Sequence, residues 1–138
     1  MSPTRFYTPQ EAEAAFYAAF AKQDLAAMMA VWADDPQIAC ILPLGPKLIG
    51  PEAVRAGWET IFHHSPQMQL LIEEQGRAQD GALAVHTVQE HIRVGGQTSQ
   101  APVLVTNIYR LTDGGWRMVL HHASPAPQPR KQRKKTLH

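Results

Sequence analysis

Two titratable side chains, His86 and Glu90, share one face of a predicted strand and could carry proton-transfer chemistry. The segment 82–94 has the residue types and the alternation of a strand, so residues 86 and 90 point the same way. An imidazole and a carboxylate in this arrangement can act as a general base and a polar anchor. Four strand residues span about 13 Å, so the two groups would contact opposite ends of one ligand. The alternative is that this face is the outer one, where both make cross-strand pairs.

The predicted last strand, 116–124, offers a third candidate for catalysis. His121 and His122 are adjacent in the sequence and therefore point to opposite faces of the sheet. We expect His122 to line the pocket, because Met118 and Leu120 on its face are apolar. An imidazole at this position can donate or accept a proton near neutral pH. The alternative is a hydrogen-bonded histidine in the core or in a dimer interface.

Further side chains are candidates for binding a ligand. Asn107 and Tyr109 share one face of the predicted strand 101–112 and could donate hydrogen bonds into a pocket, or serve only sheet packing. Large apolar side chains at helical spacing are expected mostly in the core, with some forming the apolar wall of the pocket. These are Phe16, Phe20, Met28, Trp32 and Trp58.

Metal and cofactor motifs are not found in the sequence. The seven histidines form no HExxH pattern, and adjacent histidines such as His63 and His64 rarely chelate one ion together. The pair Gly95-Gly96 has the character of a hairpin turn rather than a phosphate-binding loop. Cys40 is the single cysteine and is expected to be a buried, inert thiol. We therefore expect neither a metal site nor a cofactor.

The helices and strands that would position these residues are predicted from helix caps, the spacing of apolar residues and turn residues. Thr8-Pro9-Gln10-Glu11 is a capping box that begins one helix, Asp24 caps a second, and Gly50-Pro51-Glu52 begins a third. A short strand is predicted at 38–42. Strands follow at 67–77, 82–94, 101–112 and 116–124, separated by turn residues of the hairpin type. This order predicts an α+β fold in which three N-terminal helices cover one face of a curved antiparallel sheet.

Composition narrows the class of protein. The chain has 138 residues, of which 44% are hydrophobic, which suits one folded domain. No apolar run approaches the roughly 18 residues of a membrane span, and the first thirty residues lack the features of a signal peptide. With one cysteine and no disulfide framework, a reducing cytoplasm is the expected location.

The positive charge is concentrated at the C-terminus. Five of the 13 basic residues lie between Arg130 and Lys135, after a proline-rich break, and the remainder carries 8 basic and 12 acidic side chains, a net charge of −4. We expect a folded domain over 1–127 and a basic, flexible tail over 128–138. Nucleic-acid binding is expected of a basic patch on a folded surface, and here the basic residues lie in a tail, so nucleic acid is not an expected partner. The alternative is that the tail is a nuclear-import signal or an anchor for an acidic partner.

Three segments of the sequence resemble a known protein family. They are Leu25-Ala26-Ala27-Met28-Met29-Ala30-Val31-Trp32-Ala33-Asp34-Asp35, Leu48-Ile49-Gly50-Pro51-Glu52-Ala53-Val54-Arg55, and Gly115-Trp116-Arg117-Met118-Val119-Leu120-His121-His122-Ala123-Ser124-Pro125. Together they resemble the SnoaL-like branch of the nuclear-transport-factor-2-like superfamily, which includes ketosteroid isomerase and scytalone dehydratase. The resemblance covers about residues 8–127. It implies a cone-shaped, cystatin-like fold with an internal hydrophobic pocket, and a homodimer formed through the outer sheet face.

Two classes of function fit this resemblance. The first is an isomerase, cyclase or dehydratase that acts on a small, largely apolar carbonyl compound by removing a proton beside the carbonyl. The second is a non-catalytic module for ligand binding or dimerisation, since the ending 116–124 is also similar to the association domain of calcium/calmodulin-dependent kinases. Close relatives often have His-Pro after the first strand, whereas this chain has Leu42-Pro43. The aspartates lie at turns or helix ends, which leaves both classes open.

Overall fold

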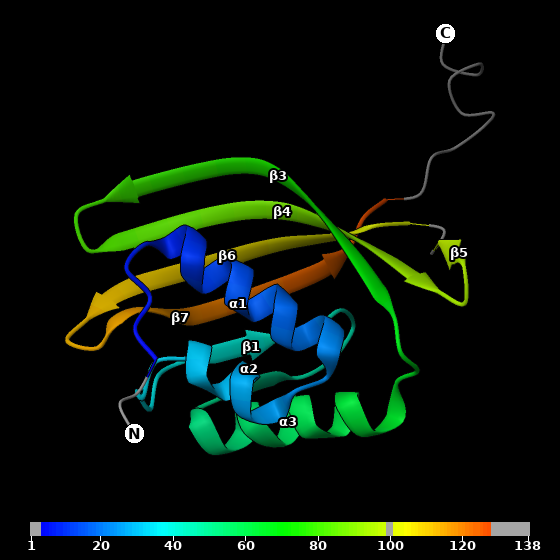
Figure 1. Ribbon diagram of the computed structural model, residues 1–138, viewed down its shortest axis with the longest axis horizontal. Helices are drawn as coiled ribbons and strands as arrows, with labels where there is room; N and C mark the ends of the chain where they lie inside the picture. The colour runs from blue at the N-terminus through cyan, green and yellow to red at the C-terminus, as the bar shows by residue number, and fades with distance from the viewer. Residues whose placement is uncertain (1–3, 99–100, 128–138) are drawn as a thin grey trace, which may run out of the picture.

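The computed structural model describes residues 4–98 and 101–127, and the predicted basic tail at 128–138 lies outside them. Within these ranges the chain forms three helices and one sheet of seven strands (Figure 1). The helices are α1 (Pro9–Lys22), α2 (Leu25–Val31) and α3 (Pro51–His64). The strands are β1 (Ala39–Ile41), β2 (Lys47–Ile49), β3 (Gln69–Asp80), β4 (Leu83–Val94), β5 (Gln97–Thr98), β6 (Val103–Thr112) and β7 (Gly115–Pro125).

The first two helices begin where their sequences predict. The Thr8 side chain accepts a hydrogen bond of 3.0 Å from the Glu11 backbone N–H, while the Glu11 carboxylate accepts one of 2.8 Å from the Tyr7 N–H. Asp24 accepts a hydrogen bond of 3.0 Å from the Ala27 N–H at the start of α2. These bonds satisfy amide groups that have no partner within the helix itself.

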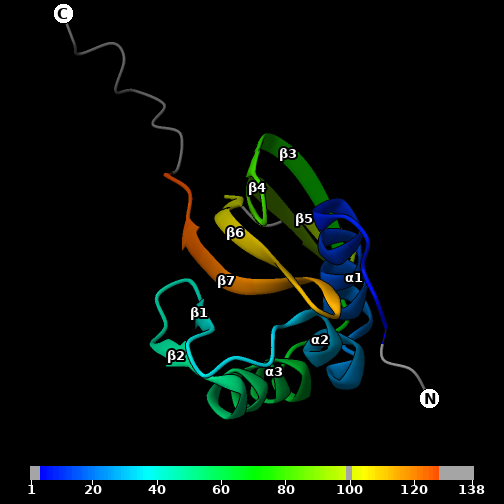
Figure 2. The same ribbon diagram turned by 90° about the vertical axis from the view of Figure 1, so that its left-hand side faces the viewer.

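The sheet is curved, and the helices lie on its concave side. Its strand order is β2-β1-β7-β6-β4-β3, with β5 paired to β4. Figure 2 shows how the sheet bends around α1, which gives the cone-shaped α+β fold expected from the sequence. One pairing departs from the predicted antiparallel pattern, because β1 runs parallel to β7. The chain enters β1 from α2 and not through a hairpin, so the connection does not impose an antiparallel direction.

Aromatic side chains fill the space between the helices and the sheet. The ring of Trp58 lies 5.6 Å from that of Phe16 and 5.0 Å from that of Phe20, measured between centroids. Trp58, Phe16 and Met28 are fully buried. No helix in the described ranges combines the length and the apolar character needed to cross a membrane.

Two β-bulges change which side chains face the core. In β3 the register shifts between Glu74 and Gly76, so that Gln75 is the extra residue. In β7 the extra residue is Val119, because Leu120 pairs with Ile108 while Met118 pairs with Tyr109. A bulge of this kind reverses the alternation of side chains along the rest of the strand.

The bulge at Val119 overturns the predicted orientation of the adjacent histidines. Met118 faces the core as expected, but beyond the bulge His121 and Ala123 are the buried residues. His122 is exposed on the outer face of the sheet. The prediction that His122 faces the interior and His121 the exterior was therefore wrong, because it assumed an unbroken alternation along β7.

Candidate functional site

Seven polar side chains are buried inside the cone, where each is at most 8% exposed. They come from α1, β4, β6 and β7. They are Glu13, Tyr17, His86, Glu90, Asn107, Tyr109 and His121. Polar groups removed from water destabilise the fold unless they are paired, so their partners define what this cluster can do.

Four of these side chains form a continuous chain of hydrogen bonds. Tyr17 Oη donates to Glu90 Oε2 at 2.8 Å, and Asn107 Nδ2 donates to Tyr17 Oη at 3.1 Å. Asn107 Oδ1 lies 2.7 Å from Nδ1 of His121. Because this amide oxygen only accepts, His121 must carry its proton on Nδ1. This hydrogen-bond chain therefore links a carboxyl group on β4 to a histidine on β7, by way of Tyr17 on α1 and Asn107 on β6.

Burial changes the protonation of both ends of this chain. Removal from water raises the pKa of Glu90 to about 7, although the hydrogen bond from Tyr17 works in the opposite direction. Burial also lowers the pKa of His121 to about 3, so its imidazole is neutral at physiological pH. Glu90 is thus the member of the hydrogen-bond chain that can gain and lose a proton near neutral pH.

A second group of side chains surrounds the Glu13 carboxyl. Tyr109 Oη donates to Glu13 Oε2 at 3.4 Å, and Asn107 Nδ2 donates to the same oxygen at 3.5 Å. His86 Nδ1 lies 3.2 Å from this oxygen. Burial and the nearby Glu74 carboxyl raise the pKa of Glu13 to about 8. The two carboxyls therefore share a site where ionising both is unfavourable.

His86 is not hydrogen-bonded to Glu13 despite this short distance. Among residues 4–98 and 101–127, its Nδ1 atom has no hydrogen-bond partner. The distance between the two atoms suits a hydrogen bond, but the angle does not. The hydrogen-bonding direction of Nδ1, which lies in the plane of the ring, does not point at the Glu13 oxygen. Burial lowers the pKa of His86, which favours the neutral imidazole.

Glu13 and Tyr17 are the site residues that sequence reasoning missed. They are four residues apart on α1 and therefore lie on one face of that helix. With Phe16 and Phe20 they form the spacing i, i+3, i+4, i+7 of a buried stripe. A glutamate in such a stripe was the signal that could have revealed the site.

The structure separates the predicted site residues into three groups. His86, Glu90, Asn107 and Tyr109 lie together in the polar cluster, on the inner face of the sheet. His122 lies outside the cone, beside a shallow groove of about 320 Å³ that is also lined by Thr87 and Thr106. The predicted apolar wall residues belong to the buried core; they are Phe16, Phe20, Met28, Trp32 and Trp58.

Residues 10–128 of the chain match the model of the SnoaL-like domain, which is most of its length. The chain belongs to the SnoaL-like domain family. The family resemblance predicted from the sequence is thereby confirmed, and solved structures described as nuclear-transport-factor-2-like have the same fold.

Several solved structures are similar to this SnoaL-like domain. A Thiobacillus denitrificans protein, described as a candidate association domain of calcium/calmodulin-dependent protein kinase type II, is 42% identical with a TM-score of 0.87, covering 90% of this chain and 99% of that one. A candidate dehydratase from Streptomyces avermitilis is 27% identical with a TM-score of 0.75, covering 83% and 91%. A ketosteroid isomerase-like protein from Erwinia carotovora is 18% identical with a TM-score of 0.71, covering 86% and 94%, and shows the fold alone.

One curated relative is a much longer protein. The F-box protein SKIP8 of Arabidopsis thaliana is 25% identical over 109 residues, which are 79% of this chain. The SnoaL-like domain spans only 46% of that relative's length, so the match concerns one part of it.

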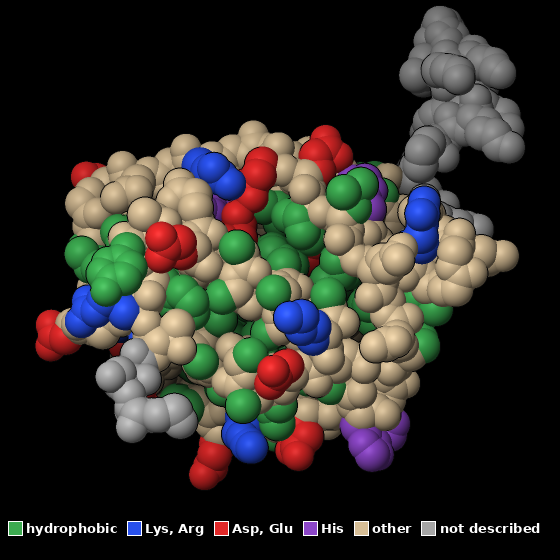
Figure 3. All heavy atoms as spheres, in the orientation of Figure 1, with side chains coloured by type: hydrophobic (Ala, Val, Ile, Leu, Met, Phe, Trp, Pro, Cys, Tyr) green, Lys and Arg blue, Asp and Glu red, His purple; other side chains and the backbone are tan. Residues whose placement is uncertain are grey.

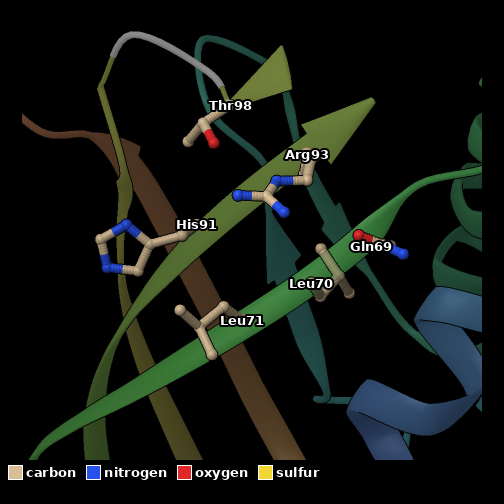
Figure 4. A pocket seen from close by; sticks show the side chains of 6 residues that line it. All are labelled: Gln69, Leu70, Leu71, His91, Arg93 and Thr98. Atoms are coloured by element: carbon tan, nitrogen blue, oxygen red, sulfur yellow. The ribbon is translucent and has the colours of Figure 1, made fainter. Parts of the chain in front are cut away.

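The SnoaL-like domain also has pockets away from the polar cluster. One of about 450 Å³ lies at the open end of β3, β4 and β5, where it is lined by Leu71, His91, Arg93 and Thr98 among others (Figure 4). Another, of about 360 Å³, lies between α2 and α3 and includes Trp32. Neither of these pockets, nor the groove beside His122, is lined by His86 or Glu90, so the polar cluster is packed inside the cone and the internal pocket that the resemblance implies is not seen at it within the described residues.

Proposed function

We propose that this SnoaL-like domain is an enzyme of the isomerase, cyclase or dehydratase kind, which moves a proton on a small, largely apolar carbonyl compound. The compound would bind in the cone beside the polar cluster, and the aromatic side chains that fill the cone would move apart to admit it. The hydrogen-bond chain Glu90–Tyr17–Asn107–His121 is the observation that carries this proposal. A core needs no such chain for stability, whereas a site for proton transfer needs a base and donors held in a dry environment.

Glu90 is the proposed acid and base of the reaction. Its pKa of about 7 means that the carboxyl is about half ionised near neutrality, so it can take a proton from carbon and return it elsewhere on the molecule. The phenol of Tyr17 donates to Glu90, and the amide of Asn107 donates to Tyr17 and Glu13; in this proposal both turn toward the carbonyl oxygen of the ligand to hold the negative charge that develops there. Phe16 and Trp58, which flank His121, supply apolar contact for the rest of the molecule.

The Streptomyces avermitilis relative supports this proposal, because it is described as a candidate dehydratase of the nuclear-transport-factor-2-like family. A dehydratase and an isomerase share the first step, which is removal of a proton beside an electron-withdrawing group. That step is the one to test, since it does not require the natural substrate to be known.

The test is hydrogen–deuterium exchange of a small cyclic enone in D₂O, followed by NMR. The full chain is expected to accelerate exchange at the carbon beside the carbonyl. Glu90→Gln keeps the size of the side chain and an oxygen that can accept from Tyr17, but it removes the base. We expect it to reduce the acceleration by about 100-fold or more.

A matched control separates this chemistry from general exchange at the protein surface. His122→Gln changes an exposed imidazole on the outer face and is expected to leave the rate unchanged. Tyr17→Phe, which removes the phenol that bonds Glu90, is expected to slow exchange. Equal rates in the wild type and Glu90→Gln across a panel of enones would refute the proposal.

Assembly is a second candidate function, and a specific surface favours it. Val85, Ile108 and Leu120 are paired side by side on β4, β6 and β7, which makes an apolar row across three strands. None of the three belongs to the core cluster, and the row lies on the outer face of the sheet. All three side chains are partly exposed, and apolar rows of this kind favour association. The partner we propose is a second copy of the chain.

The Thiobacillus denitrificans relative points the same way. It is 42% identical and is described as a candidate association domain. Pairing through the outer face would leave the polar cluster untouched, because that cluster lies on the opposite face of the same strands. The two proposed functions are therefore compatible.

A further inference from the structure

The three side chains Glu13, Glu74 and His86 come together at the edge of the cone near β3. Each offers one ligand atom, and these atoms lie within 4.8 Å of one another. Figure 3 shows acidic side chains gathered next to a basic one over this part of β3 and β4. The bulge at Gln75 contributes to the arrangement, because it places both Glu74 and Arg77 on the inner face of the edge strand.

We propose that Glu13, Glu74 and His86 bind a divalent transition-metal ion, such as Zn²⁺. Two carboxylates and one imidazole form a mixed oxygen and nitrogen donor set that suits such an ion. Three protein ligands leave a further position for water or a substrate, which is the arrangement of catalytic zinc sites and not of structural ones.

The orientation of His86 is the observation that points to a ligand. Its side chain is 1% exposed, and Nδ1 has no hydrogen-bond partner in the described part of the chain. Nδ1 and Glu13 Oε2 lie 3.2 Å apart without aiming at each other. Two ligands of one ion are related in just this way, since metal–ligand bonds of 2.0–2.2 Å place neighbouring donor atoms about 3.0–3.4 Å apart.

The surroundings of Glu13 match what a metal ligand requires. Tyr109 Oη and Asn107 Nδ2 both donate to Oε2, which holds the carboxyl in one orientation. Groups that orient a ligand in this way are typical partners of bound metals. Glu13 itself is buried and cannot turn toward water, so its position is fixed before any ion arrives.

Glu74 provides the mobile side of the site. Its side chain is 35% exposed, and one oxygen, Oε1, lies 3.2 Å from Nε of Arg77. Because it is partly exposed, this side chain can rotate toward Glu13 and His86 when an ion binds. Arg77 competes with the ion for Glu74, since both are cations.

The experiment titrates the full, tag-free chain with Co²⁺, which replaces Zn²⁺ and reports its environment by visible absorption. We expect one Co²⁺ per chain, displaced by Zn²⁺. Glu74→Gln changes only an exposed edge of the sheet and should keep the fold, yet it should weaken Co²⁺ binding by about ten-fold or more. His86→Gln should weaken it similarly, with circular dichroism as the check on folding.

Three control variants make the result specific. His91→Gln alters a partly exposed imidazole that also lies 3.0 Å from a glutamate, and His64→Gln alters one of two adjacent exposed histidines. Both should leave Co²⁺ affinity unchanged. Arg77→Gln removes the competing cation and should tighten binding by about two- to five-fold.

The proposal is overturned by any of three results. These are unchanged Co²⁺ affinity in Glu74→Gln, loss of the spectrum in His91→Gln or His64→Gln instead, and no binding to the wild type at roughly millimolar Co²⁺. None of these readouts depends on catalysis, so the metal site stands or falls separately from the proposed proton transfer by Glu90.

Discussion

The Nδ1 atom of His121 lies 2.7 Å from Oδ1 of Asn107, inside the cone, while its neighbour His122 is exposed on the other face of the sheet. His121 also lies against Phe16 and Trp58, with ring centroids 4.9 and 5.9 Å away. It therefore joins the polar cluster to the aromatic core, and its replacement should disturb both.

We expect His121→Ala to lower the free energy of unfolding by about 2–4 kcal/mol, because it leaves the Asn107 oxygen without its partner and opens a cavity. His122→Ala should change it by less than about 0.5 kcal/mol. Urea denaturation at pH 7 measures both. Equal effects of the two variants would contradict the orientation of β7 described above.

The raised pKa of Glu90 predicts a pH dependence of stability. The folded protein holds this proton up to a pKa of about 7, compared with 4.5 for an ordinary glutamate. Between these values the unfolded chain binds fewer protons, so a rise in pH destabilises the folded state. The effect is about 1.4 kcal/mol per pH unit, or about 3 kcal/mol in total, and it is complete above pH 7.

Glu90→Gln isolates this contribution. The difference in unfolding free energy between wild type and variant should shift in favour of Glu90→Gln as the pH rises from 4.5 to 7, and should be constant outside that range. Denaturation curves at several pH values provide the measurement. A difference that is independent of pH would mean that Glu90 titrates as an exposed carboxyl does.

The apolar row on the outer face predicts the oligomeric state. Light scattering should give twice the 15.3 kDa mass of one chain. Ile108→Glu places a charge in the middle of the row and should produce monomers, because the carboxylate would lose its water in the interface. Ala56→Glu adds the same charge to an exposed position of α3 and should leave the dimer intact. A monomeric wild type at micromolar concentration would rule out the proposed pairing.

Gly115, at the start of β7, occupies a position that excludes any other residue. Its φ angle is +105°, and a Cβ atom would lie 2.7 Å from the carbonyl oxygen of Phe6. We expect Gly115→Ala to lower stability by about 3 kcal/mol or more. Gly81 also has a positive φ angle, but a Cβ atom there would meet nothing within 4 Å. Gly81→Ala should therefore lower stability by only about 1–2 kcal/mol. Thermal unfolding of both variants compares the cost of a steric clash with Phe6, at Gly115, with the cost of a positive φ angle alone, at Gly81.

The basic tail is expected to make little difference to stability. Residues 128–138 lie outside the described part of the structure, and their sequence has five basic residues but few apolar ones. Truncation after Pro127 should therefore leave the melting temperature within a few degrees of the full chain. A large drop measured by calorimetry would show that the tail docks on the acidic body.

The sequence by itself determined the three helices, the family and five of the seven strands described; the short strands β2 and β5 were not predicted. The caps at Thr8 and Asp24 are local signals, and each acts on the few residues that follow it. Alternation along β4 and β6 placed His86 with Glu90, and Asn107 with Tyr109, on common faces. This was correct because the described register between these two strands contains no bulge.

The tertiary structure decided which of these side chains meet. Glu13 and Tyr17 reach the site only because α1 lies against the inner face of the sheet, and a helix's own sequence does not specify the strand it contacts. The bulges at Gln75 and Val119 bring Arg77 and His121 to the inner face, and they accompany the curvature that lets the sheet wrap the helices. Curvature is a property of the whole packed sheet, so local residue preferences could not reveal whether His121 or His122 faces the core.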